Sequence, residues 1–223
     1  MSHSTKLFIG LVLVFTAATT HAALMLSGST AGFFQPVASP HVTITNNADG
    51  SLASFRTGVP VGNSFKSGVK FNGHEFENVG DGDTFSLGML TYYNGISRLG
   101  TSSGTALLDL YLDFEDPAAG KVHLTTITFG IDATANTAAH LAPDAFTASF
   151  LQPSPIWLGD ELVKFTINGL SQSTLVAENT WTDLASITVT VLIPEASTYA
   201  AMLGIAAMGF TLLRRRHMLG TVQ

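Results

Sequence analysis

The chain has 223 residues, with 10 basic and 16 acidic side chains, a net charge of −6 and no cysteine. Without its ends, residues 23–197 hold 6 basic and 16 acidic residues, a net charge of −10 (6 − 16). This charge disfavours nucleic acid and anionic membranes as partners, because both are bound through clustered Lys and Arg. The lack of cysteine excludes disulfides, so the fold depends on its core alone.

Residues 1–22 have the three parts of a secretory signal peptide. Lys6 supplies a positive charge, residues 7–15 are apolar, and small residues follow up to Ala22. We predict cleavage between Ala22 and Ala23, because Thr20 and Ala22 provide the small residues at −3 and −1. The apolar run is shorter than the ~20 residues of a permanent transmembrane helix. Export is therefore predicted; the alternative is that this segment is a buried first element of the fold.

Residues 23–193 show the alternation of apolar and polar side chains that is typical of half-buried strands. The pattern recurs in the segments 42–45, 85–89, 108–114, 163–167 and 187–193. It places Phe85, Leu87 and Met89 on one face of their strand.

In the segment 122–131 the apolar parity changes at Thr125-Thr126, which predicts a β-bulge or a bend. Turn residues separate the strands at 46–50, 80–83, 94–95, 116–120 and 168–169. The segment 23–193 is thus predicted to be one all-β domain, an antiparallel β-sandwich of the jelly-roll kind. A signal helix precedes this domain and a single membrane helix follows it.

Four patterns within this domain were weighed as sites of chemistry. Asp81 and Asp83, which alternate with Gly80 and Gly82, could hold calcium on a flexible turn, although the spacing is not that of an EF-hand. The alternative is a turn whose carboxylates bind their own backbone.

The second pattern is Gly100-Thr101-Ser102-Ser103-Gly104, which matches the G-x-S-x-G motif of a hydrolase nucleophile. That chemistry needs a strand, a sharp turn and then a helix. Because residues 105–114 alternate as a strand, a serine-rich loop between strands is the favoured interpretation.

The third pattern is a set of neighbouring carboxylates, Asp113, Glu115 and Asp116. Asp113 and Glu115 share a strand face, which brings them within the 5–9 Å or so that separates the two carboxyl groups of a glycosidase. Any two residues at this spacing on a strand meet that criterion, so a solvated strand end is favoured over a catalytic pair.

The fourth pattern concerns isolated histidine and tryptophan residues. The histidines of the exported domain, His41, His74, His123 and His140, show no metal-ligand spacing, so zinc is not predicted. Trp157 and Trp181 could stack on sugar rings if they are exposed, and would otherwise be packing residues.

The segment 194–223 has three parts in order: Pro194-Glu195, the uncharged apolar run 199–213, and Arg214-Arg215-Arg216. As a helix the apolar run reaches about 22 Å, and snorkelling arginines extend its effective span. The positive-inside rule places the arginines in the cytoplasm and the domain 23–193 across the membrane. A lasting membrane anchor and a buried core helix are the alternatives.

This tail resembles the PEP-CTERM sorting signal, with Pro194 and Glu195 at the motif and Ala196 in place of its second proline. The resemblance implies an exosortase-type processing enzyme as partner, removal of the tail, and delivery to the outside of a Gram-negative cell. The stretch 84–95 resembles the choice-of-anchor K domain, with weaker similarity at 131–136 and 144–147. That resemblance implies surface anchoring and brings no activity with it.

Together these observations predict an exported, non-catalytic protein of the cell surface or extracellular matrix, associated with exopolysaccharide. It would be a substrate of the secretion machinery and an exosortase. No cofactor is predicted, calcium being the one that was considered. The alternatives are a secreted polysaccharide hydrolase that uses Asp113 and Glu115, and a calcium-stabilised structural module.

Overall fold

The computed structural model describes residues 24–98, 101–116, 120–132, 143–168, 173–177 and 179–193, with positions 204, 207 and 208. The predicted signal peptide, the cleavage site at Ala22 and Ala23, and the motif residues Pro194, Glu195 and Arg214–Arg216 lie outside these residues, as does His140. Residues Leu24–Ile193 form one compact unit. Within the described parts of the chain, no helix has the length and apolarity to cross a membrane.

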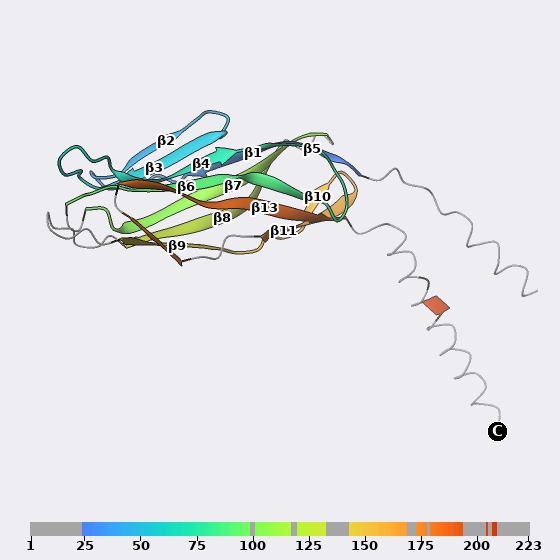
Figure 1. Cartoon of the computed structure of the whole chain (residues 1–223). Helices are drawn as coiled ribbons and strands as arrows, with labels where there is room; N and C mark the ends of the chain where they lie inside the picture. The colour runs from blue at the N-terminus through green and yellow to red at the C-terminus, as the bar shows by residue number, and fades with distance from the viewer. Residues whose placement is uncertain are drawn as a thin grey trace, which may run out of the picture. The chain divides into compact units, whose positions relative to one another are not determined.

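The domain is all-β, as predicted, and its strands form two antiparallel sheets (Figure 1). The six-stranded sheet has the order β12 (Ser173–Val176), β9 (Asp144–Phe150), β8 (Gly120–Asp132), β7 (Gly104–Asp116), β1 (Leu26–Phe34) and β5 (Glu75–Val79). The seven-stranded sheet has the order β10 (Ile156–Leu158), β11 (Glu161–Asn168), β13 (Thr180–Leu192), β6 (Thr84–Asn94), β4 (Ser67–Gly73), β3 (Leu52–Thr57) and β2 (Thr43–Asn46).

One hydrophobic core lies between the two sheets and is crossed by aromatic pairs. The ring centroids of Phe34 in β1 and Phe55 in β3 are 5.9 Å apart. Those of Tyr92 in β6 and Phe146 in β9 are 4.9 Å apart. Each such side chain stabilises the fold by about 1.5–3 kcal/mol through burial, so these contacts hold the two layers together.

The alternation in the sequence correctly identified the buried faces of β7, β11 and the second half of β13. In β7 the side chains of Leu108, Leu110 and Leu112 are all buried. In β13 and β11 the inward positions of the segments 187–193 and 163–167 are buried in the same way. These segments could be predicted because, over 108–114, 163–167 and 187–191, apolar buried positions alternate with largely polar outward ones.

The predicted bulge in β8 is confirmed. Leu110 pairs with Thr125 and Tyr111 pairs with His123, so Leu124 is the extra residue. Leu124 and Thr125 are both buried. This insertion moves the apolar side chains from one parity to the other without turning the strand out of the core.

The prediction that Met89 lies on the buried face of its strand is wrong, because its side chain is 43% exposed. The cause is a register shift in β6, where Gly88 pairs with Ile187 but Ser86 pairs with Thr188. Gly88 has a φ of +138°, a conformation that L side chains rarely adopt. The irregularity brings Leu90 and Tyr92 into the core instead of Met89.

The predicted turn between β2 and β3 is present and is closed by a side chain. Asp49 accepts hydrogen bonds from the backbone N–H and the hydroxyl of Ser51, at 3.0 and 2.9 Å. These bonds, the backbone one first, lower the pKa of the exposed Asp49 carboxyl. Gly50 completes the turn with a φ of +79°.

Candidate functional site

A row of four residues crosses the outer face of the seven-stranded sheet. Arg56 of β3 pairs with Gly68 of β4, Gly68 pairs with Tyr93 of β6, and Tyr93 pairs with Trp181 of β13. All four positions point away from the core, because their strand neighbours Phe55, Val69 and Tyr92 are buried.

A second row lies two residues further along the same strands. Here Ser54 pairs with Lys70, Lys70 with Thr91, and Thr91 with Asp183. The second row therefore places one lysine beside the arginine of the first row and one aspartate beside the tryptophan.

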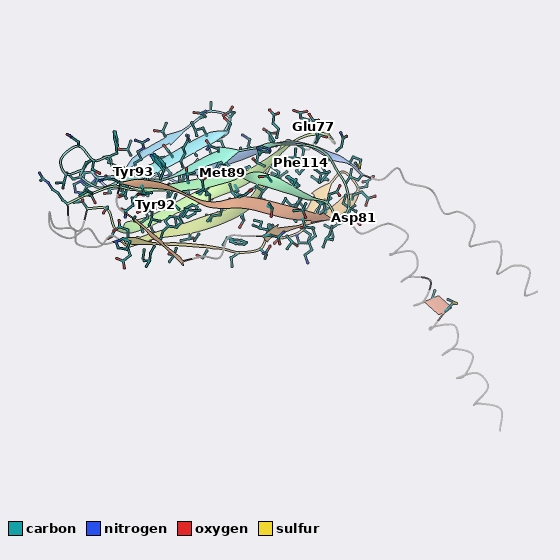
Figure 2. All side chains as sticks on the ribbon, viewed as in Figure 1. Glu77, Asp81, Met89, Tyr92, Tyr93 and Phe114 are labelled. Atoms are coloured by element: carbon teal, nitrogen blue, oxygen red, sulfur yellow. The ribbon has the colours of Figure 1, made fainter. Side chains whose placement is uncertain are left out.

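Trp181 is an exposed aromatic platform on this face. Its side chain is 54% exposed, and its ring lies 5.0 Å from that of Tyr93, centroid to centroid. On the other side, the Phe65 ring, which is 65% exposed, meets Tyr93 edge-on at 6.2 Å. Tyr93 is itself buried, so the two exposed rings pack against a side chain with little freedom to move. Figure 2 labels Tyr93 at one end of the domain.

A hydrogen-bond network fixes this aromatic cluster at its edge. The Tyr93 hydroxyl donates to the Asn179 Oδ1 atom at 3.1 Å, and the Ser64 hydroxyl donates to the same atom at 2.8 Å. Asn179 has a φ of 53° and comes just before β13. The network thereby joins the segment before β4 to the start of the strand that carries Trp181.

These residues line an open groove of about 400 Å³, hereafter the aromatic groove. Its lining comprises Leu52, Ser54, Arg56, Phe65, Lys66, Gly68, Val69, Lys70, Tyr93 and Trp181. Gly68 leaves a hollow between Arg56 and Tyr93. A Cβ atom at that position would lie 2.3 Å from the Phe55 carbonyl oxygen, so no other residue fits without a backbone shift.

The groove gathers basic residues in an acidic molecule. Three of the six Lys and Arg residues in the segment 23–197 line it: Arg56, Lys66 and Lys70. The Lys66 ammonium donates to the His41 carbonyl at 3.1 Å and to the Thr43 hydroxyl at 3.0 Å. This arrangement offers aromatic faces and positive charge to one ligand at the same surface.

The chain matches no protein-family model and no curated protein.

The two aspartates of the predicted calcium turn are both bonded to backbone in the structure. The Asp83 carboxylate accepts a hydrogen bond from the Gly80 N–H at 2.8 Å, and the Asp81 carboxylate accepts one from the Ile193 N–H at 2.6 Å. Across the described ranges, no three His, Asp or Glu side chains are grouped as metal ligands. The geometry favours the turn interpretation, and calcium binding stays an untested alternative.

The serine motif lies in a loop that leads directly into β7, not into a helix. Ser102 is buried, and its hydroxyl accepts a hydrogen bond from the Ser97 hydroxyl at 2.6 Å. The strand context that the sequence predicted is present, so the pattern lacks the helix amino terminus of a nucleophile elbow.

The neighbouring carboxylates at the end of β7 face solvent. Asp113 lies 3.9 Å from the Lys121 ammonium and its side chain is 43% exposed, while Glu115 is exposed. The side chain of Asp116 lies outside the described residues. Of the histidines, His123 lies 3.7 Å from Asp109, and His41 and His74 lie in other regions of the fold.

Both tryptophans are exposed, and Trp181 lines the aromatic groove. Trp157 is 67% exposed on the short strand β10 and is not part of the groove lining. The sequence indicated Trp157 and Trp181 equally as sugar-stacking or packing residues, and no pattern in it indicated Phe65, Tyr93 or Arg56. Their meeting depends on the register of four strands, which no local pattern contains.

Proposed function

We propose that this chain is an exported, non-catalytic protein of the cell surface or extracellular matrix that binds exopolysaccharide through the aromatic groove. The observation that carries this proposal is the exposed Trp181 ring resting on Tyr93, with Phe65 on the other side. A pyranose ring has an apolar C–H face, which gains contact energy when it stacks on such a ring.

The form of the groove suits a polymer better than a small, enclosed ligand. It is open along the sheet surface, and its exposed aromatic rings, Trp181 and Phe65, each contact Tyr93 instead of enclosing a cavity. A polysaccharide can therefore cross it with its ends in solvent. Binding of this kind needs rigid aromatic contacts and no catalytic group.

The location is proposed from the two ends of the chain. The signal peptide predicts export from the cytoplasm, with cleavage between Ala22 and Ala23, and the resemblance of the tail implies a Gram-negative bacterium. The tail, with Pro194, Glu195 and the Arg214–Arg216 cluster, resembles a PEP-CTERM signal. We propose that it anchors the protein in the membrane transiently and is then cut by an exosortase-type enzyme.

The finer class of the fold is also proposed. The chain passes repeatedly between the two antiparallel sheets, for example from β1 to β2 and from β6 to β7. Such crossings are typical of a jelly-roll-like β-sandwich. They are compatible with the resemblance of the stretch 84–95 to a choice-of-anchor K domain, a stretch that forms β6.

Replacing Trp181 tests whether the aromatic groove binds polysaccharide. We expect Trp181→Ala to weaken binding of exopolysaccharide from the producing bacterium by about tenfold or more, because a central aromatic anchor carries over 1 kcal/mol of binding energy. Affinity electrophoresis of the full chain through gels that contain the polysaccharide measures this. Trp157→Ala is the matched control, since it removes an exposed tryptophan outside the groove.

Two results would contradict the proposal. One is a wild-type protein whose migration is unchanged by the polysaccharide at any concentration. The other is an equal loss of binding in Trp181→Ala and Trp157→Ala, which would show that tryptophan exposure, and not the groove, governs retention.

A further inference from the structure

We infer that the polysaccharide is anionic, and that Arg56, Lys70 and Lys66 select its carboxylate or sulfate groups while Trp181 holds a neighbouring sugar ring. This inference rests on the proposed function and adds the chemical class of the ligand. It is argued from the position, pairing and surroundings of the three cations.

Positive charge is scarce in this molecule and is concentrated at the groove. The cations of residues 23–197 are Arg56, Lys66, Lys70, Arg98, Lys121 and Lys164. Lys121 lies near Asp113, on the other sheet. A cluster that holds half of the cations of a domain with a net charge of −10 forms a local positive field, which raises the concentration of anions at that surface.

The side chains of Arg56 and Lys70 have no ion-pair or hydrogen-bond partner among the described residues, although the two residues are close neighbours on the sheet. Arg56 pairs with Gly68, and Lys70 is two residues from Gly68, so the cations are diagonal across β3 and β4. Diagonal residues are about 7–8 Å apart between Cα atoms. Two like charges at that spacing repel each other in the free protein, and a bound anion would relieve the repulsion.

The third cation is fixed in place at the same edge. The Lys66 ammonium uses two of its three N–H donors on the His41 carbonyl and the Thr43 hydroxyl. One donor therefore remains for a ligand. Because the side chain is already held, the entropic cost of binding through it is reduced.

The two ends of the groove differ in charge. The cations line the part over β3 and β4, whereas the exposed Asp183 lies in the second row on β13, beside the Trp181 end. Arg56 and Trp181 are three strand spacings apart, about 14 Å at about 4.8 Å each. The charged group of one sugar is thus expected over Arg56 and Lys70, with a later ring of the same chain on Trp181.

Single-stranded nucleic acid is the other polymer that combines flat rings with negative charge. Its binding sites follow the backbone with a continuous positive groove. Here Asp183 stands at the aromatic end, and the domain as a whole is strongly acidic. These observations favour an anionic glycan, and an oligonucleotide serves as the competing probe.

The test measures binding of the purified full chain to alginate, dextran sulfate, dextran and an oligothymidylate under the same salt conditions. We expect alginate or dextran sulfate to bind at least about tenfold more tightly than dextran, and the stronger of the two identifies carboxylate or sulfate as the recognised group. Arg56→Gln and Lys70→Gln are each expected to weaken that binding about tenfold, the effect of losing one charge-assisted hydrogen bond. Lys164→Gln, an exposed lysine of β11 outside the groove lining, should leave it unchanged.

The outcomes separate this inference from the proposed function. If dextran binds as tightly as the charged polymers and only Trp181→Ala weakens binding, the groove binds sugar and the charge selection is wrong. If the charged polymers bind but Lys164→Gln weakens binding as much as Arg56→Gln, general charge attraction replaces the groove cations. If no polysaccharide binds, both proposals fail, and tighter binding of the oligothymidylate would assign the groove to nucleic acid.

Discussion

Gly88 bears the backbone conformation on which the two faces of β6 depend. Its φ of +138° is rarely adopted by residues with a Cβ atom, and a Cβ there would lie 2.2 Å from the Asn72 carbonyl oxygen. We expect Gly88→Ala to lower the free energy of unfolding by about 1–3 kcal/mol, the usual cost of such a strained residue. Urea denaturation followed by tryptophan fluorescence measures the change.

Gly104→Ala provides the control at the same scale. Gly104 also lies in a strand, but a Cβ atom there would have no neighbour within 4 Å, and its φ is not positive. This variant should be as stable as the parent or slightly more stable. Equal stability of the Gly88 and Gly104 variants would contradict the role assigned to the irregularity in β6.

At the scale of elements, the turn between β5 and β6 secures the end of β13. Asp81 accepts a hydrogen bond from the Ile193 N–H, and the Gly82 N–H donates to the Val191 carbonyl at 2.9 Å. The Val191 N–H in turn donates to the Asp83 carbonyl at 3.0 Å. These hydrogen bonds, hereafter the clamp, join the last residues before the tail to a turn more than a hundred residues earlier.

Removing the carboxylate should loosen this end of the domain. We expect Asp81→Ala to lower the free energy of unfolding by about 1 kcal/mol, the net value of one hydrogen bond. The loss is no larger because Asp81 is exposed and water replaces the carboxylate as partner. Hydrogen exchange at the Ile193 amide should become faster, which mass spectrometry or NMR detects. Asp160→Ala, in the exposed turn before β11, is the control, and an unchanged Ile193 amide would refute the clamp.

The strands differ in how well the sequence predicts them, and the reason is the side chains they carry. β7, β11 and β13 alternate strictly, so their buried faces could be predicted. The buried face of β1 could not be predicted, because the middle of this strand consists of Gly, Ser, Thr and Ala and has no apolar period. Gly28 and Gly32 lie where neighbouring backbone and rings approach too closely for a side chain. β6 does end at the predicted Asn94-Gly95, but the sequence did not show that Asn94 is buried there with its amide donating to the Val176 carbonyl.

The candidate site shows the same limit more sharply. Trp181 could be named from the sequence as an aromatic residue of unknown exposure. Its partners Arg56, Lys70 and Tyr93 come from strands that are distant in the chain, and only the register brings them together. Register depends on the packing of whole sheets and on irregularities such as that at Gly88, so it cannot be predicted from local patterns in a single sequence.

At the scale of the whole molecule, β13 connects the groove to the tail. The strand begins at Thr180, next to Trp181, and ends at Leu192, just before Ile193 and the predicted sorting motif. Eleven residue steps from Trp181 to Leu192 span about 36 Å at about 3.3 Å each. Figure 2 accordingly labels Tyr93 and Asp81 at opposite ends of the domain. Within the domain, the groove and the last described residues before the tail therefore lie at opposite ends of β13.

Where the groove acts therefore depends on whether the signal peptide and the tail have been removed. Cleavage after the signal peptide and within the tail would free a domain that begins at Ala23 and ends between Pro194 and Thr198. The clamp at Ile193 protects the β domain, so we expect no cut upstream of that residue. Intact-mass spectrometry of the protein from the medium and from the membranes of the producing bacterium measures both ends.

A mass that still includes Arg214 to Gln223 would contradict exosortase-type processing and would make the tail a lasting membrane anchor. The groove would then serve to tether polysaccharide to the membrane, since it lies at the opposite end of β13 from Leu192. A mass that ends before Ile193 would contradict the clamp instead, because the end of β13 would have been open to proteolysis. Each species found thus assigns the groove either to the free matrix or to the cell surface.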